Sequence, residues 1–346
     1  MSFRSWVTII TLILLALVVF FGWGEIMQAW GLLGQVSVGI LLLLIPVQIF
    51  SYYATGGTIF SYLRSKGNLK TTNHWQMARM SLELNFVNHI LPSGGAAGFS
   101  YLGWVLHRFG VSPGRATMAQ IVRFALTFVS FIVMLVVTVI ALTLDHKIDR
   151  VIIMICTALA FATIGATILA VYIISNKARM LRFAGWLTRT INKFLLKVSR
   201  KKERKPVKLK VIEDFFSELH QDYLEIRREK KILAKPFVWA LLGNISDVAL
   251  LFIAFWALGF IINPAMLFVA YGISSIASVF TATPGGAGVY EAVMIAFLAS
   301  AGVSADVAIA GTLLARVTLL LGTILFGYVF YQLTVSKYGK SPSANL

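Results

Sequence analysis

Apolar residues run through this chain in blocks that are too long for one face of a soluble helix. The clearest blocks cover residues 6–21, 31–53, 116–144, 151–175, 236–260 and 305–333. A helix needs roughly 20 apolar residues to cross a bilayer, and these blocks are close to that length or exceed it. The pattern predicts an all-α, polytopic integral membrane protein with about six spanning helices.

Two further apolar regions, 75–107 and 264–300, are each interrupted near the middle by proline and glycine. Proline removes a backbone donor and glycine favours open conformations, so both helices are expected to break there. A break at membrane depth is tolerated only where protein or a watery cavity satisfies the freed backbone groups. We therefore expect two re-entrant helical hairpins, with turns at Pro92, Gly94, Gly95, Pro284, Gly285, Gly286 and Gly288.

Composition agrees with the membrane class. The chain is 58% hydrophobic and 13% charged, whereas soluble domains are about 45–50% apolar and about 25% charged. The net charge of +17 comes mostly from residues between the apolar blocks, which favours positive-inside topology and anionic lipid headgroups over nucleic acid. The first block has no small-residue cleavage site, and we interpret it as a retained helix.

The distribution of basic residues predicts the topology. The loop after the first block holds Glu25 and no Lys or Arg, whereas the loop after the second block is basic, so both chain termini are expected on the inner side of the cytoplasmic membrane. The first hairpin then enters from the cytoplasm and the second from outside. A basic cytoplasmic linker, 177–235, is expected to contain helices at 180–198 and 211–231, either on the membrane surface or solvated.

The two interrupted regions belong to a longer internal match. Gly94-Gly95 is followed by Gly110-Val111-Ser112 and Arg123, and Gly285-Gly286 is followed by Gly302-Val303-Ser304 and Arg316. Together with the opposed orientations, this predicts an inverted repeat with halves at 1–144 and 151–333. Inverted repeats with broken helices are found in transporters, where the breaks point to the binding site.

The second break also resembles a known family. The run Pro284–Glu291, PGGAGVYE, is similar to the Pro-Gly-Gly-x-Gly-x-aromatic-Glu motif of the lysylphosphatidylglycerol synthase transmembrane-region family. That family supplies the flippase part of multiple peptide resistance factors. Asn88 and Pro92 resemble its first motif, although Ala97-Gly98-Phe99 stands where relatives commonly have Gly-Glu. The resemblance implies a stand-alone member without the aminoacyl-transferase domain, for which lipid modification does not carry over.

Ionisable residues inside apolar segments are costly and usually face the protein interior. The candidate headgroup-binding residues are Arg123, Arg316, Glu291, Asp247, Asn244, Glu83 and Asn88. The second arm of each hairpin is expected to present free N–H groups, which Arg123 and Arg316 would reinforce as a pair of phosphate sites. The alternative is an ion pair of Arg316 with Glu291 or Asp247. Asn244 and Asp247 either line a cavity or bind a coupling cation, or they form interhelical hydrogen bonds.

These features favour a lipid flippase that moves a headgroup by alternating access. The expected partners are membrane lipids with anionic or aminoacylated headgroups, and further candidate partners are a second copy of the chain or a lipid synthase. One alternative is a scaffold that binds anionic lipid through the linker and recruits a synthase. A membrane-embedded lipid-modifying enzyme is disfavoured, because the sequence shows no catalytic constellation, cofactor loop or metal-ligand spacing.

Overall fold

The computed structural model describes residues 35–90, 96–144, 150–176, 209–279 and 286–338, together with positions 20, 178, 179, 182, 185 and 186. Every regular element in these ranges is helical, which confirms the predicted all-α class. The elements are α3 (Val38–Leu41), α4 (Leu44–Ser65), α5 (His74–Ile90), α6 (Ala96–Arg108), α7 (Pro113–Leu144), α8 (Arg150–Ile174), α10 (Leu209–Arg228), the 3₁₀ turn η2 (Lys230–Leu233), α11 (Ala234–Ala257), α12 (Pro264–Val279), α13 (Val289–Ser300) and α14 (Ala305–Tyr338).

Within the described residues, five helical stretches are long and apolar enough to cross a membrane. They cover Val38–Ser65, Pro113–Leu144, Met154–Ile173, Lys230–Ala257 and Ala305–Tyr338, and each corresponds to a predicted span. The protein is therefore a multi-pass membrane protein. The remaining predicted span, 6–21, lies outside the described residues except for position 20.

The second predicted span needs the largest correction, because its helix continues twelve residues beyond Tyr53, to Ser65. The continuation looks polar and glycine-rich in sequence, yet Gly57 and Thr58 are buried. A Cβ atom at Gly57 would lie 2.5 Å from the indole of Trp239 on α11. A glycine costs a helix about 1 kcal/mol relative to alanine, and close packing of α4 on α11 offsets that cost.

Helices α7 and α14 begin with the same local arrangement. Gly110 and Gly302 have positive φ angles of 75° and 89°, and the next residue's N–H donates to the carbonyl five positions back, Val111 to Leu106 and Val303 to Leu298. This is the Schellman pattern that ends a helix at glycine. The two Gly-Val-Ser runs thus each end one helix and precede the next. The inverted repeat over the whole chain stays a prediction.

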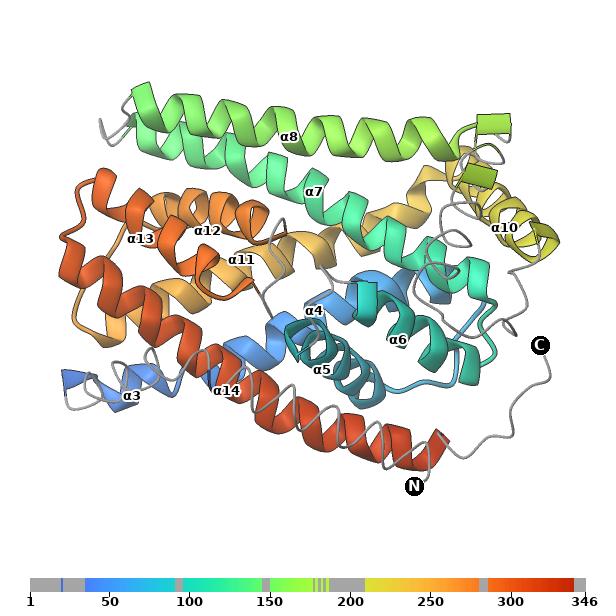
Figure 1. Cartoon of the computed structure of the whole chain (residues 1–346), viewed down its shortest axis with the longest axis horizontal. Coiled ribbons are helices and arrows are strands. Elements are labelled where there is room, and N and C mark those ends of the chain that lie inside the picture. Colours follow the sequence, from blue (N-terminus) through green and yellow to red (C-terminus); the bar gives the residue numbers. More distant parts are fainter. Residues whose placement is uncertain are drawn as a thin grey trace, which may run out of the picture.

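The predicted hairpins correspond to two pairs of packed helices, α5 with α6 and α12 with α13. Figure 1 shows α12–α13 at one end of the long helices α7 and α8, and α5–α6 towards the other end, where α10 also lies. The predicted turn residues Pro92, Gly94, Gly95, Pro284 and Gly285 lie outside the described residues. How deeply each pair enters the bilayer stays a prediction.

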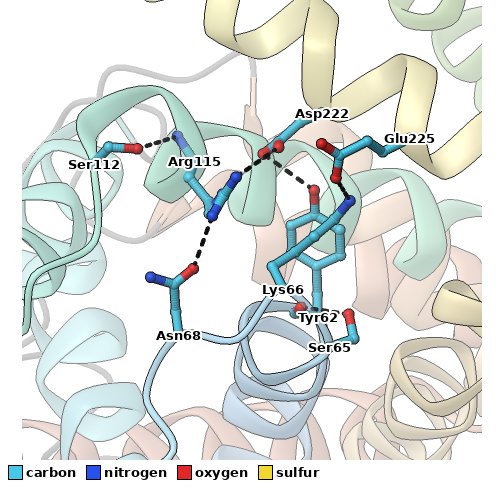
Figure 2. A network of polar contacts seen from close by, with 8 residues as sticks. All are labelled: Tyr62, Ser65, Lys66, Asn68, Ser112, Arg115, Asp222 and Glu225. Atoms are coloured by element: carbon cyan, nitrogen blue, oxygen red, sulfur yellow. Dashed lines mark hydrogen bonds and ion pairs between the residues drawn. The ribbon is translucent and has the colours of Figure 1, made fainter.

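The predicted linker helix 211–231 is confirmed as α10, and a charged network fixes it to the helix bundle. Figure 2 shows Asp222 and Glu225 of α10 facing Arg115 of α7 and Lys66 after α4. Arg115 Nη2 lies 3.5 Å from Asp222 Oδ1, and Lys66 pairs with Glu225. Tyr62 donates to Asp222 Oδ2 at 3.3 Å. Because Leu219 is also buried in the core, α10 is docked on the bundle. The other predicted linker helix, 180–198, falls mostly outside the described residues.

We expect the two carboxylates of this network to give α10 docking opposite pH dependences. The hydrogen bond from Lys66 lowers the pKa of Glu225, so its stabilisation is present above the usual pKa and is lost as pH falls through the lowered value. Burial raises the pKa of Asp222, so its contribution is present at low pH and is lost as pH rises through the raised value.

Single variants separate the two effects. In Asp222→Asn, hydrogen-exchange protection of α10, corrected for intrinsic exchange, should fall on acidification. In Glu225→Gln it should rise. Equal pH profiles in the two variants would contradict this assignment of the two carboxylates.

Candidate functional site

A polar cavity of about 300 Å³ lies among α4, α5, α11, α12, α13 and α14. The helices around it are largely apolar, but the cavity wall is not. Its polar lining residues are Gln48, Ser51, Tyr52, Thr55, Asn85, His89, Asp247, Tyr271, Ser275, Ser278, Tyr290, Thr312, Arg316 and Thr323. Buried polar side chains are expensive inside a bilayer and usually mark a substrate or ion site, so this cavity is the candidate functional site.

One side of the cavity carries an ion pair between Arg316 and Glu291. Arg316 Nε lies 2.6 Å from Glu291 Oε1, and the two side chains are 11% and 5% exposed. The contact is an ion pair rather than a well-aligned hydrogen bond. The guanidinium also lies 4.8 Å from the ring centroid of Tyr290, a cation–π distance. Of the two partners suggested by the sequence, Glu291 is therefore the one that pairs with Arg316.

The turn that leads into α13 places this carboxylate. Gly286 and Gly288 have φ angles of 74° and 88°, and a Cβ atom on Gly286 would lie 2.4 Å from Cβ of Ser278. The Gly288 N–H donates to Glu291 Oε2 at 2.6 Å. The predicted anion site at this helix N-terminus therefore needs correction, because the chain's own carboxylate, favoured there by the helix dipole, already accepts a hydrogen bond.

Asp247 of α11 supplies a second carboxylate to the cavity wall. It accepts hydrogen bonds of 2.8 Å from Ser51 of α4 and from the Tyr271 hydroxyl of α12. No ion pair to Asp247 is present among the described residues. The sequence left open whether Asp247 lines a cavity or forms interhelical hydrogen bonds. In the structure Asp247 does both, because it faces the cavity and links three helices.

His89 is the cavity's only histidine among the described lining residues. Its Nδ1 lies 2.8 Å from the backbone oxygen of Asn85. A carbonyl oxygen only accepts, so Nδ1 carries the hydrogen and Nε2 of the neutral ring is an acceptor. His89 therefore offers a hydrogen-bond acceptor to the same cavity that Arg316 lines.

Glu83 does not line the cavity, contrary to its predicted role in headgroup binding. Its carboxylate pairs with Arg79 at 2.8 Å and accepts hydrogen bonds of 2.7 Å from Tyr101 and Thr334. Arg79 donates in turn to Thr334 at 2.7 Å. Glu83 is fully buried, and its contacts join α5, α6 and α14. Its role in the structure is to hold these helices together.

Asn244, Arg123 and Asn88 also lie outside the cavity wall. Asn244 donates to Ser130 Oγ at 2.6 Å and to the Thr127 carbonyl at 3.1 Å, so it forms the interhelical contact that the sequence suggested as its alternative role. The Arg123 guanidinium lies 4.3 Å from the Phe124 ring centroid. Asn88 packs directly on Gly98 of α6. The predicted pairing of Arg123 and Arg316 in equivalent sites is therefore not what the cavity shows.

Sequence reasoning missed most of the uncharged cavity residues. On α4 these are Gln48, Ser51, Tyr52 and Thr55, and on α12 they are Tyr271, Ser275 and Ser278. Residues three, four and seven positions apart share one helix face, so both sets form a polar face within an apolar span. The spacing of these uncharged polar residues is visible in the sequence and predicts the polar faces. Selecting candidates by charge alone omits them.

Comparison with known proteins agrees with this architecture. Residues 6–327 match the family model described as the lysylphosphatidylglycerol synthase TM region. This chain belongs to that family. A UPF0104 membrane protein of Methanothermobacter thermautotrophicus is 23% identical over 232 residues, which cover 66% of this chain and 67% of that protein. The family model spans the cavity and both predicted hairpins.

The cavity combines charged and hydroxyl-bearing side chains in its wall. Its wall offers a cation in Arg316, a carboxylate in Asp247 and many hydroxyl groups, in a space at the lower end of the roughly 300–1,000 Å³ of ligand pockets. Among the described residues, no three His, Cys, Asp or Glu side chains come together as a metal site would require.

Proposed function

We propose that this protein is a lipid transporter that moves a phospholipid or related amphiphile across the cytoplasmic membrane, with the lipid headgroup in the polar cavity. The observation that carries the proposal is a charged, hydroxyl-lined cavity whose wall includes three helices, α4, α11 and α14, that are long and apolar enough to span a bilayer. A headgroup must leave water to cross the membrane, and such a cavity replaces part of its hydration. Membership of a family named for a lipid synthase's membrane region supports the lipid class.

The charges on the cavity wall suggest which headgroups fit. Arg316 lines the cavity, and arginine binds phosphate oxygens through several donors at once. Asp247 lines the same cavity and would attract an ammonium group. The proposal therefore covers phosphate-bearing headgroups, including aminoacylated ones in which phosphate and ammonium occur together.

Arg316 also supplies a way to alternate between empty and loaded states. Its charge is balanced by Glu291 in the structure. A bound phosphate would compete for the same guanidinium and weaken the contact between α13 and α14. We propose that this exchange, at the base of the second hairpin, couples headgroup binding to movement of that hairpin. Topology with both termini in the cytoplasm is part of the same proposal.

Reconstitution in vesicles tests the proposed function. Purified protein should accelerate movement of headgroup-labelled phosphatidylglycerol or lysylphosphatidylglycerol between leaflets, measured by loss of access to an impermeant quencher. Asp247→Asn should lower the rate for the ammonium-bearing lipid more than tenfold, because it removes the carboxylate that faces the cavity. The matched control is Asp306→Asn, an exposed carboxylate at the start of α14, which should transport normally. Failure of the unmodified protein to move either lipid would refute the proposal.

A further inference from the structure

The polar cavity is too small for a whole lipid, which raises the question of where the acyl chains lie. Its volume of about 300 Å³ accommodates a headgroup, whereas each acyl chain needs an apolar surface of its own. A second hollow, of about 460 Å³, lies next to the cavity between α3–α4, α5 and α14. Its exposed lining is mostly apolar and includes Ile45, Ile49, Ala78, Leu82, Phe326 and Phe330, with Arg79 and Thr318 among its few polar residues. We call this hollow the α4–α14 groove.

The groove and the cavity share a wall. Gln48 and Tyr52 of α4 line both spaces. Gln48 Nε2 donates to the Tyr52 hydroxyl at 2.6 Å and to the Leu319 carbonyl of α14 at 2.9 Å, and the hydroxyls of Tyr52 and Thr323 are hydrogen-bonded to each other. Side chains of α4 and α14, held by these hydrogen bonds, thus form the partition between the two spaces.

The groove side of this partition lies at the exposed surface of the described helices. Ile45 is 52% exposed, Ile49 is 55% exposed and Phe326 is 62% exposed. Exposed apolar side chains on spanning helices are solvated by acyl chains. The partition therefore separates a polar headgroup site from an apolar surface that is continuous with the bilayer.

We propose that the α4–α14 groove binds an acyl chain of the lipid whose headgroup occupies the cavity, and that Gln48, Tyr52 and Thr323 form the gate through which that headgroup enters. The inference rests on the proposed transport function. It adds the path by which the headgroup enters the cavity and the chemical class of the ligand's tail. The occupant follows from the way the two spaces adjoin. A lipid has one polar and one apolar end, and these ends fit the polar cavity and the apolar groove respectively. The competing occupant is the chain's own apolar segment 6–21.

The molecule offers a matched control surface. A second apolar groove, of about 330 Å³, lies between α7 and α8, with Val136, Ala160 and Phe161 in its wall. It shares no lining residue with the polar cavity. Non-specific coating by bilayer lipid would treat the two grooves alike, whereas a transport route would use only the first.

Photolabelling tests the binding site. The protein is placed in vesicles that contain phosphatidylglycerol with a diazirine in its acyl chain, and adducts are mapped by mass spectrometry. We expect adducts at Ile45, Ile49 and Phe330 to exceed those at Val136 and Phe161 at least fivefold, and to be lost in Ala78→Trp, which fills the groove. Equal labelling of the two grooves would overturn the proposal.

Cysteine cross-linking tests the competing occupant. Cys156 is the chain's single cysteine, so Cys156→Ala gives a background for paired cysteines at Leu14 and Phe326. Near-complete disulfide formation without lipid adducts would assign the groove to segment 6–21 and overturn the proposal. Absence of the disulfide together with groove adducts supports it.

Transport rates then test the gate. Ala78→Trp, or the more exposed Ile49→Trp if the first variant fails to fold, should slow lipid transport at least tenfold, whereas Ala160→Trp should not. Thr323→Val removes the two hydrogen bonds that join Thr323 to Gln48 and Tyr52 in the gate. It should raise the entry rate at least fivefold, because one neutral hydrogen bond alone accounts for a factor of about five. Thr143→Val, which loses only a bond within its own helix, is the control.

The two proposals fail in different ways. Unmodified protein that moves lipid while Ala78→Trp and Thr323→Val leave its rate unchanged overturns the groove and gate, and transport itself stands. Unmodified protein that moves no lipid overturns transport, and the photolabelling pattern still decides whether the groove binds an acyl chain.

Discussion

Replacing Arg316 by methionine is expected to lower the free energy of unfolding by about 3–5 kcal/mol, because it leaves the buried Glu291 carboxylate without its cation. The pair is 2.6 Å apart and both side chains are almost completely buried, so solvent screens the interaction little. Thermal or detergent-titration unfolding of purified protein measures the change. The same variant should lose binding of phosphate-bearing lipid.

The double variant Arg316→Met with Glu291→Gln separates the ion pair from the packing. Removing both charges should recover much of the lost stability, because a buried pair contributes little beyond an apolar replacement once neither charge is left alone. Transport should stay lost, since Arg316 is the one lysine or arginine among the described residues that line the cavity. Arg108→Met, at an exposed position on α6, is the matched control. An Arg316→Met protein as stable as the unmodified one would contradict the ion-pair role.

A second large loss of stability is expected on substitution of Glu83. Glu83→Ala should also cost about 3–5 kcal/mol of unfolding free energy, because Arg79 loses its charged partner and two hydroxyl groups lose their acceptor. Three helices meet at this carboxylate. Its removal should therefore lower the cooperativity of unfolding as well as the midpoint of the unfolding transition. Measurement by the same unfolding titration allows direct comparison with Arg316→Met.

Smaller changes in the same cluster give a graded series. Thr334→Val removes the hydrogen bond to Glu83 and the one accepted from Arg79, and should cost about 2 kcal/mol. Glu229→Ala, an exposed carboxylate, should change stability by less than about 0.5 kcal/mol. If Glu83→Ala proved no more harmful than Thr334→Val, the cluster would not be the anchor that its geometry indicates.

Much of the fold could be predicted because its signals are local. Spanning helices follow from apolar length, and the break before α13 follows from glycines whose φ angles are positive in the structure. The Gly-Val-Ser runs end one helix and begin the next through bonds between neighbouring residues. Errors in the boundaries arose where burial overrode local preference, as in the glycine-rich end of α4 that packs against Trp239.

The candidate site was predicted less well, because charge identifies costly residues without identifying their partners. Of the seven residues chosen from sequence, Arg316 and Asp247 line the cavity and Glu291 pairs with Arg316. Glu83 is equally buried and ionisable, but its partner Thr334 lies 251 positions away. Nothing local distinguishes such a helix anchor from a binding residue.

The sequence by itself determined that this is a helical membrane protein with two interrupted apolar regions, because apolar length and backbone chemistry act over a few neighbouring residues. Only the tertiary structure decided which polar groups share a cavity, that Arg316 pairs with Glu291, and that Gln48, Tyr52 and Thr323 separate that cavity from an apolar groove. Those contacts depend on how each helix is rotated against its neighbours. That rotation is set by packing among residues that are distant in the chain.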